Sequence, residues 1–104
     1  MTAVFEDLQI TRIERQSLGG GGTWVQGRLA GHRFDALVFA GHAEVPEYEY
    51  EHSRISKLWV QRLADRRTVF NWDRGADVEA ADETTQAIVG FLASGLAEFV
   101  MPIE

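Results

Sequence analysis

The C-terminal part of the chain carries an apolar stripe with helical spacing, and this stripe constrains the fold most. Apolar side chains recur there every three or four residues, at Ile88, Phe91, Leu92, Leu96, Phe99 and Val100. Asp82 is a favourable N-cap, Glu83 complements the helix dipole in the first turn, and Pro102 stops the helix. We therefore expect an amphipathic helix over residues 82–100. Gly90 and Gly95 within it are expected to permit close approach to a neighbouring layer.

In two segments in the middle of the chain, apolar and polar side chains tend to alternate, and a short turn separates the segments. Residues 24–29 and 33–40 predict a β-hairpin that reverses at Ala30-Gly31. A tight turn there makes Leu29 face His32, Gly27 face Phe34, and Val25 face Ala36. The other face of the hairpin then brings Arg28 beside Arg33, with Asp35 as the diagonal neighbour that can bridge them.

A second pair of strands follows. Residues 55–63 predict the strongest strand, with a turn at 64–66 and a return strand over 68–72. Simple alternation places Ile55, Lys57, Trp59, Gln61 and Leu63 on one face and Leu58, Val60 and Arg62 on the other. Both faces are partly apolar, so we expect each to be covered or to be used for association.

The N-terminal part is ambiguous. Residues 7–16 favour a strand, although the residues around Val4 and Leu8 can also begin a short helix. The glycine run at 19–22 is expected to be a flexible connection, because it lacks the spacing of a phosphate-binding loop.

Together these elements predict an α+β fold in which one C-terminal amphipathic helix packs on an antiparallel sheet of four to five strands. We expect a single domain over residues 1–104. It would comprise an N-terminal strand and flexible Gly-rich connection (1–22), the antiparallel strands (24–72) and the helix (82–100).

Composition excludes several classes of protein. The 104 residues include no cysteine, which excludes a disulfide framework, a thiolate zinc site and a cysteine nucleophile, and suits a cytoplasmic protein. No apolar run reaches the roughly 18 residues of a membrane span, and the N-terminus lacks a leader pattern, so we expect no membrane partner. The net charge of −6 argues against direct binding of nucleic acid.

Two patterns are candidates for a metal site. His32, His42 and His52 recur every ten residues and can be joined by a carboxylate. The segment 71–79 alternates oxygen-bearing side chains, Asp73 and Asp77 among them, but it departs from a calcium-binding loop in its glycine and its last ligand. We expect turn and surface roles for these residues and no cofactor, and keep His32, His42, Asp73 and Asp77 as the candidates.

One short segment alternates acids with aromatics and is a candidate partner-binding site. Its residues are Glu47, Tyr48, Glu49, Tyr50 and Glu51. The alternation suits docking on a basic partner, or imitation of a nucleic-acid strand. It also suits an edge segment whose tyrosines lie on the protein while the glutamates face water.

Residues 24–39 and 53–79 resemble a small bacterial and phage-associated family of unknown function. The resemblance rests on Trp24-Val25-Gln26-Gly27, Gly31 to Phe39, Ser53 to Trp59 and Asp73 to Asp77. It implies a compact sheet-plus-helix unit and an intracellular setting, and it assigns no catalytic residue.

The sequence favours a binding or assembly module over an enzyme, since no Gly-x-Ser-x-Gly or comparable nucleophile motif occurs. Our first hypothesis is a non-enzymatic protein-interaction and self-association module, whose partner is a second copy (a homodimer) or another protein. The first alternative is an acidic inhibitor or decoy that binds the cationic site of a nucleic-acid enzyme. The second is a small metal-dependent enzyme.

Overall fold

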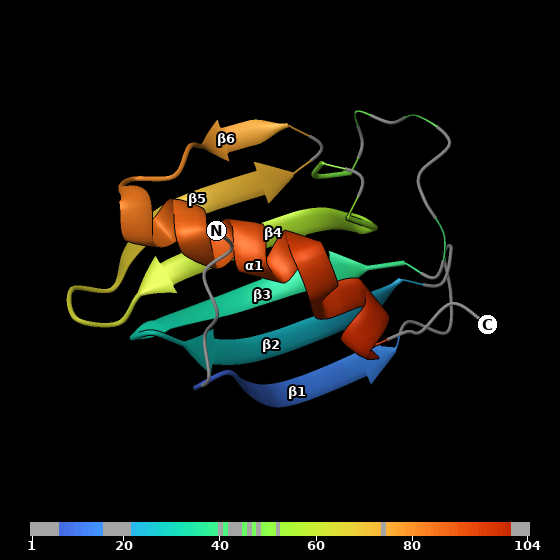
Figure 1. Ribbon diagram of the computed structural model, residues 1–104, viewed down its shortest axis with the longest axis horizontal. Coiled ribbons are helices and arrows are strands. Elements are labelled where there is room, and N and C mark those ends of the chain that lie inside the picture. Colours follow the sequence, from blue (N-terminus) through green and yellow to red (C-terminus); the bar gives the residue numbers. More distant parts are fainter. Residues whose placement is uncertain are drawn as a thin grey trace.

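The computed structural model contains six β-strands and one α-helix (Figure 1). It describes residues 7–15, 22–39, 41, 45, 47, 49–51, 53–73 and 75–100. The elements are β1 (Gln9–Arg15), β2 (Thr23–Leu29), β3 (His32–Val38), β4 (Ile55–Arg62), β5 (Arg67–Asp73), β6 (Ala76–Val78) and α1 (Glu83–Val100).

The strands form one antiparallel sheet whose spatial order is the order in the chain, β1 to β6. Each strand therefore pairs with its sequence neighbours, and the topology is a simple meander. The expected α+β class and the C-terminal helix are confirmed, and the ambiguous N-terminal segment is a strand. The expected count of four to five strands is too low, because Ala76–Val78 pairs with β5 as a short edge strand.

The β2–β3 hairpin has the register that the sequence predicts. Leu29 pairs with His32, Gly27 with Phe34 and Val25 with Ala36. Ala30 and Gly31 form the turn with φ angles of 49° and 72°. Two successive positive φ values match the two-residue turn whose twist suits an antiparallel hairpin.

One side of the sheet is covered by α1, which crosses it diagonally (Figure 1). Ile88, Val89 and Leu92 of the helix are at most 1% exposed and join Val25, Phe34 and Val60 of the sheet in one apolar cluster. Burial of each such side chain stabilises the fold by roughly 1.5–3 kcal/mol. The helix and sheet therefore form the two layers of the structure.

Two expectations for the helix are wrong. Phe99 fits the helical period but is 70% exposed, because the position of the last turn on the sheet, and not the period, decides what is covered. A Cβ atom built on Gly90 or Gly95 meets nothing within 4 Å. These glycines therefore do not serve a close approach to the sheet.

β-Bulges also revise which residues share a face in β4. Leu37 pairs with Lys57 but the next residue, Val38, pairs with Ile55, so Ser56 is the extra residue. The bulge returns Ile55, which is fully buried, to the helix-covered face. The expectation that Ile55 shares a face with Trp59 is therefore wrong. Leu63 lies beyond the strand, in the following turn, and is 37% exposed.

Candidate functional site

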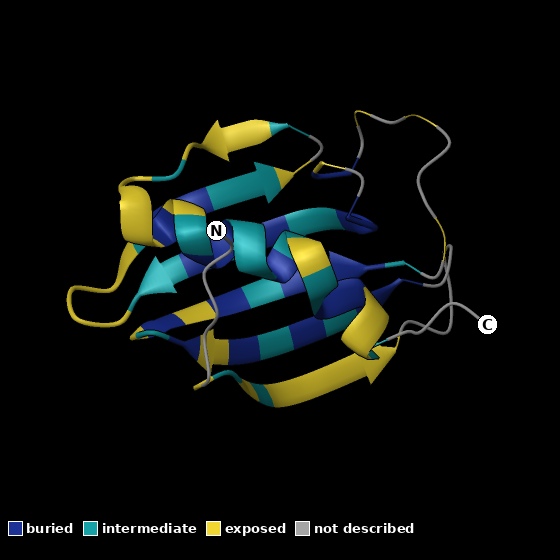
Figure 2. Cartoon of the chain, viewed as in Figure 1, coloured by how far each residue is buried: buried dark blue, intermediate teal, exposed yellow. Residues whose placement is uncertain are grey.

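The face of the sheet turned away from α1, called the open face below, is the main candidate site. The strand registers align its side chains in three rows. The first row is Arg28, Arg33, Gln61 and Thr68; the second is Arg12, Gln26, Asp35, Trp59 and Asn71; the third is Glu14, Trp24, Leu37, Lys57 and Asp73. Along β2 and β3 buried residues alternate with more exposed ones (Figure 2), as expected where the helix covers one face only.

Trp59 lies at the centre of the open face and is held from two sides. The guanidinium carbon of Arg33 is 5.5 Å from the centre of its ring system. Its indole Nε1 donates a hydrogen bond to Thr68 Oγ1 at 3.1 Å. The ring is only half-buried, so an ordered aromatic surface faces outward, as is common in the centres of protein interfaces.

A hollow of about 260 Å³ lies beside this centre, between β1, β2 and β3, and is lined by Arg12, Glu14, Trp24, Gln26 and Asp35. The Arg12 guanidinium and the Glu14 carboxylate pair across its outer edge at 3.0 Å. Within the described part of the chain, the enclosed Oδ1 atom of Asp35 has no hydrogen-bond partner. A carboxylate oxygen without a donor is costly, and Asp35, which lines the hollow, lacks a donor at this oxygen.

Arg28 and Arg33 stand directly opposite each other on β2 and β3. The expected bridge from Asp35 is not formed, and among the ion pairs of the described residues neither arginine has an acid partner. Two facing cations repel each other unless an anion joins them. This end of the open face therefore presents two guanidinium groups with unused donors.

Leu37 is buried although it lies on the open face. It packs next to Gly22, where an added Cβ atom would come within 2.7 Å of its Cδ1 atom and 3.1 Å of Phe39 Cζ. Leu37 itself is 8% exposed. A small apolar cluster thus closes the end of the open face opposite to Arg28 and Arg33.

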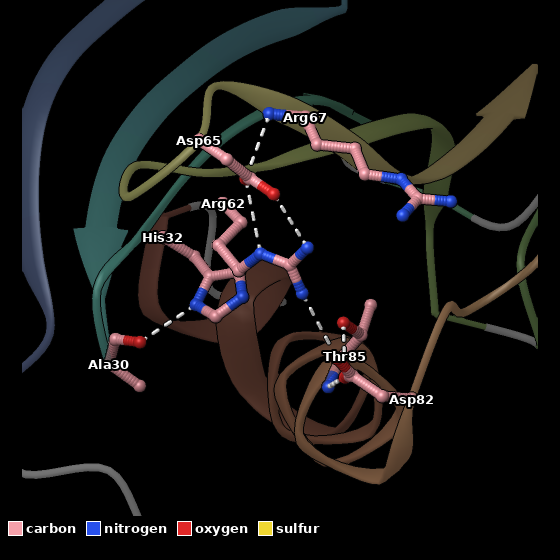
Figure 3. Close-up of polar contacts among 7 residues, drawn as sticks. All are labelled: Ala30, His32, Arg62, Asp65, Arg67, Asp82 and Thr85. Atoms are coloured by element: carbon pink, nitrogen blue, oxygen red, sulfur yellow. Dashed lines mark hydrogen bonds and ion pairs between the residues drawn. The ribbon is translucent and has the colours of Figure 1, made fainter.

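A second polar cluster joins the start of α1 to the sheet (Figure 3). Asp82 caps the helix, since its Oδ1 accepts bonds from the Thr85 backbone N at 2.8 Å and from Thr85 Oγ1 at 2.7 Å. Arg62 pairs with Asp65 at 2.8 Å and with Asp82 at 3.4 Å. The hydrogen bond from Arg62 lowers the pKa of Asp65 to about 2, and the bonds from Thr85 lower the pKa of Asp82. These contacts anchor the helix and confirm Asp82 as its cap.

The metal candidates are not brought together. His32 is buried at the start of β3, where its Nδ1 donates to Ala30 O at 2.7 Å, and its Nε2 lacks a partner in the part of the chain that is described. Asp73 lies at the opposite end of the sheet, 3.9 Å from Lys57 Nζ, and Asp77 is exposed on β6. His42 and His52 lie outside the described residues. No group of three or more metal-ligating side chains occurs among the residues that are described.

The acid–aromatic segment is divided between the interior and the surface. Glu49 is 4% exposed and accepts a hydrogen bond from the Arg54 backbone N at 2.6 Å. Tyr50 is 8% exposed and meets the rings of Phe70 and Trp72 edge-on at 5.6 and 5.4 Å. This burial raises the Tyr50 pKa. Glu47 and Glu51 are exposed, and Tyr48 lies outside the described residues.

The hollow and its unpartnered carboxylate oxygen did not emerge from the sequence as a site. The available signal was the hairpin register, which aligns Trp24, Gln26 and Arg28 with Arg33 and Asp35 on one face. The register predicts which side chains are neighbours on this face, but it does not show that the Asp35 carboxylate fails to pair with an arginine.

A family model matches residues 23–97, and the chain therefore belongs to the family described as a domain of unknown function, DUF7678. The match begins with β2 and ends within α1, so it includes the hairpin, Trp59 and most of the helix. No curated protein and no solved structure matches the chain. Among the described helical residues, no helix is long and apolar enough to cross a membrane.

Proposed function

We propose that this protein is a non-enzymatic self-association module that forms a homodimer through the open face of its sheet. The observation that carries the proposal is the one-sided cover of the sheet: α1 packs on one face, while Trp24 and Trp59 lie half-buried on the other. Half-buried tryptophans next to arginines are typical of the residues that dominate binding energy in interfaces.

The open face is large enough for a stable contact. The molecule measures 35 × 28 × 25 Å, and Figure 1 looks down the shortest axis onto the plane of the sheet. A specific interface of standard size buries about 800 Å² on each partner. The five longer strands, of seven or eight residues each and about 4.8 Å apart, span roughly 25 by 20 Å of backbone, and their side chains add to the area that two open faces can bury against each other.

The charge on the open face favours a second copy as the partner. The chain carries a net charge of −6, which makes two copies repel each other in general. The open face is nearly balanced instead. Its charged residues are the four cations Arg12, Arg28, Arg33 and Lys57 and the three acids Glu14, Asp35 and Asp73. Contact through this face therefore brings together surfaces with little net charge.

The two alternative functions have less support. An acidic decoy would use residues 44–51 and the acids of 73–83, but Glu49 and Tyr50 of the first segment are buried within the chain. A metal-dependent enzyme built on His32, Asp73 and Asp77 has its candidates at separate ends of the sheet. We therefore propose neither.

Sedimentation velocity from low micromolar to several hundred micromolar protein tests the proposal. We expect the wild-type chain to move from monomer to dimer. Trp59→Glu and Asn71→Glu, which place a charge at the centre of the open face, should keep the chain monomeric. Asn71→Glu serves as the second variant because it removes no apolar side chain, and circular dichroism checks that both variants are folded.

Phe99→Glu is the matched control, because Phe99 is 70% exposed on the helix and lies away from the open face. It should dimerise like the wild type. A wild-type chain that stays monomeric throughout, or a Phe99→Glu variant that alone loses association, contradicts the proposal.

A further inference from the structure

We propose that the guanidinium of Arg33 from one copy binds the carboxylate of Asp35 in the second copy, and that two such reciprocal pairs set the register of the homodimer. The inference rests on the proposed self-association through the open face, and it names the residues that recognise the partner.

Asp35 provides the acceptor. Its Oδ1 atom is enclosed and has no hydrogen-bond partner among the described residues, although it lies on the face that the helix leaves uncovered. In the monomer this atom is closed off from solvent, so a donor from a second copy binds it once the side chains around it move apart. A cationic donor forms the strongest such bond with a carboxylate.

The surroundings of Asp35 suit a guanidinium. The hollow of about 260 Å³ next to it has Trp24 as an aromatic wall and Gln26 as a further oxygen-bearing neighbour, while its lining cation Arg12 is paired with Glu14. A planar cation gains from stacking on an indole ring and from donors that fit a carboxylate in two places. The Asp35 carboxylate beside this aromatic wall therefore suits a guanidinium.

Arg33 provides the donor. It has no acid partner among the ion pairs of the described residues, and its opposite neighbour on β2 is the cation Arg28. Its guanidinium lies over the Trp59 ring. This contact restricts the side chain before binding, so less conformational entropy is lost when the pair forms.

Two-fold symmetry of a homodimer can bring Arg33 of one copy next to Asp35 of the second copy. A two-fold axis that lies between two stacked sheets and crosses the strands places β3 over β3 of the second copy and reverses its direction. Arg33 and Asp35 are two residues apart on one face of β3. An axis between them therefore puts Arg33 over the second copy's Asp35, and Asp35 over its Arg33. The same operation places Arg28 over Gln26 of the second copy, at the edge of the hollow. Such a contact is isologous, as expected for a homodimer.

A charge-exchange experiment tests this pairing. Arg33→Asp alone and Asp35→Arg alone each create two like-charged pairs in a homodimer, so each should weaken dimerisation by about tenfold or more. An equal mixture of the two variants forms a heterodimer in which both pairs have opposite charges again. We expect this mixture to associate within about threefold of the wild-type affinity, and fluorescence anisotropy with one variant labelled measures it.

The variant with both substitutions in one chain separates the alternatives. It should also dimerise, because the aspartate introduced by Arg33→Asp then faces the arginine introduced by Asp35→Arg in the second copy. If this double variant associates while the mixture of single variants does not, the two residues act within one chain and the inference is overturned. The inference also fails if either single variant dimerises like the wild type, although a wild-type dimer then still supports the proposed function. A monomeric wild type removes both.

Discussion

The guanidinium of Arg33 lies 5.5 Å from the ring centre of Trp59, on the strand next to it and on the open face of the sheet. The contact orders two residues of the proposed interface before any partner binds. A cation over an indole ring at an exposed site contributes about 0.5–1 kcal/mol to stability.

A double-mutant cycle measures this contact in the monomer. We expect Arg33→Ala and Trp59→Leu to be coupled by about 0.5–1 kcal/mol in the free energy of unfolding, because each substitution removes the same cation–ring contact. Urea unfolding at low micromolar protein gives the free energy of unfolding of the wild type, of each single variant and of the double variant. Additive effects of the two substitutions would show that the contact contributes nothing in solution.

Asp82 connects the start of α1 to the sheet through a helix cap. We expect Asp82→Ala to lower the melting temperature by several degrees, because it leaves the Thr85 amide without its acceptor and removes a partner of Arg62. Asp82→Ser keeps a capping oxygen and should retain most of the stability. Glu83→Ala is the matched control for charge, since Glu83 is exposed in the first turn. An equal loss in the Glu83 variant would contradict the capping role.

Stability should fall in acid through the same cluster. The Arg62 hydrogen bond lowers the pKa of Asp65 to about 2, whereas an unfolded aspartate titrates at about 3.9. The unfolded chain then binds more protons between these values, so this contribution is complete above about pH 4 and is lost as the pH falls towards 2. Asp82 has a lowered pKa and acts in the same direction.

Urea unfolding between pH 2 and 6 measures this loss. Asp65→Asn should flatten the acid limb of the stability profile, and Arg62→Gln should flatten it similarly because it removes the contact from the other side. A profile that keeps its wild-type slope in both variants would show that the Arg62–Asp65 pair does not control acid stability.

Two glycines should respond to alanine in opposite ways. A Cβ atom on Gly27 would come within 2.6 Å of Phe34 Cζ and 2.7 Å of the Gln9 carbonyl oxygen. The backbone of β1 cannot move aside without loss of strand pairing, so Gly27→Ala should cost about 1–3 kcal/mol. Gly90 is helical and has open space around it, so Gly90→Ala should stabilise the chain by up to about 1 kcal/mol. Chemical denaturation of both variants checks the contrast, and a stable Gly27→Ala variant would contradict the packing of Phe34.

The hairpin and the helix were predictable because short-range signals determine them. The turn at Ala30-Gly31 sets the register of β2 and β3, and the apolar period from Ile88 to Leu96 identifies the side of α1 that packs. The structure contains the predicted hairpin register and the predicted packed side of the helix, because the tertiary contacts agree with the local sequence pattern.

Other features depend on contacts between distant residues, so the sequence pattern could not show them. The bulge at Ser56 interrupts the alternation of β4 and turns Ile55 to the helix side. The three residues of β6 are too few to show a period. The missing partner of Asp35 is likewise a matter of geometry, since its place next to two arginines predicts a bridge that does not form.

The indole N–H resonances of the three tryptophans report directly on whether two copies meet through the open face. Trp24 and Trp59 lie on the open face, whereas Trp72 packs against the core on the helix side. When the protein is concentrated from monomer to dimer, we expect the signals of Trp24 and Trp59 to shift with protein concentration and that of Trp72 to keep its chemical shift. Signals of Trp24 and Trp59 that do not move, or a shift of Trp72 alone, would contradict the open face as the surface of association.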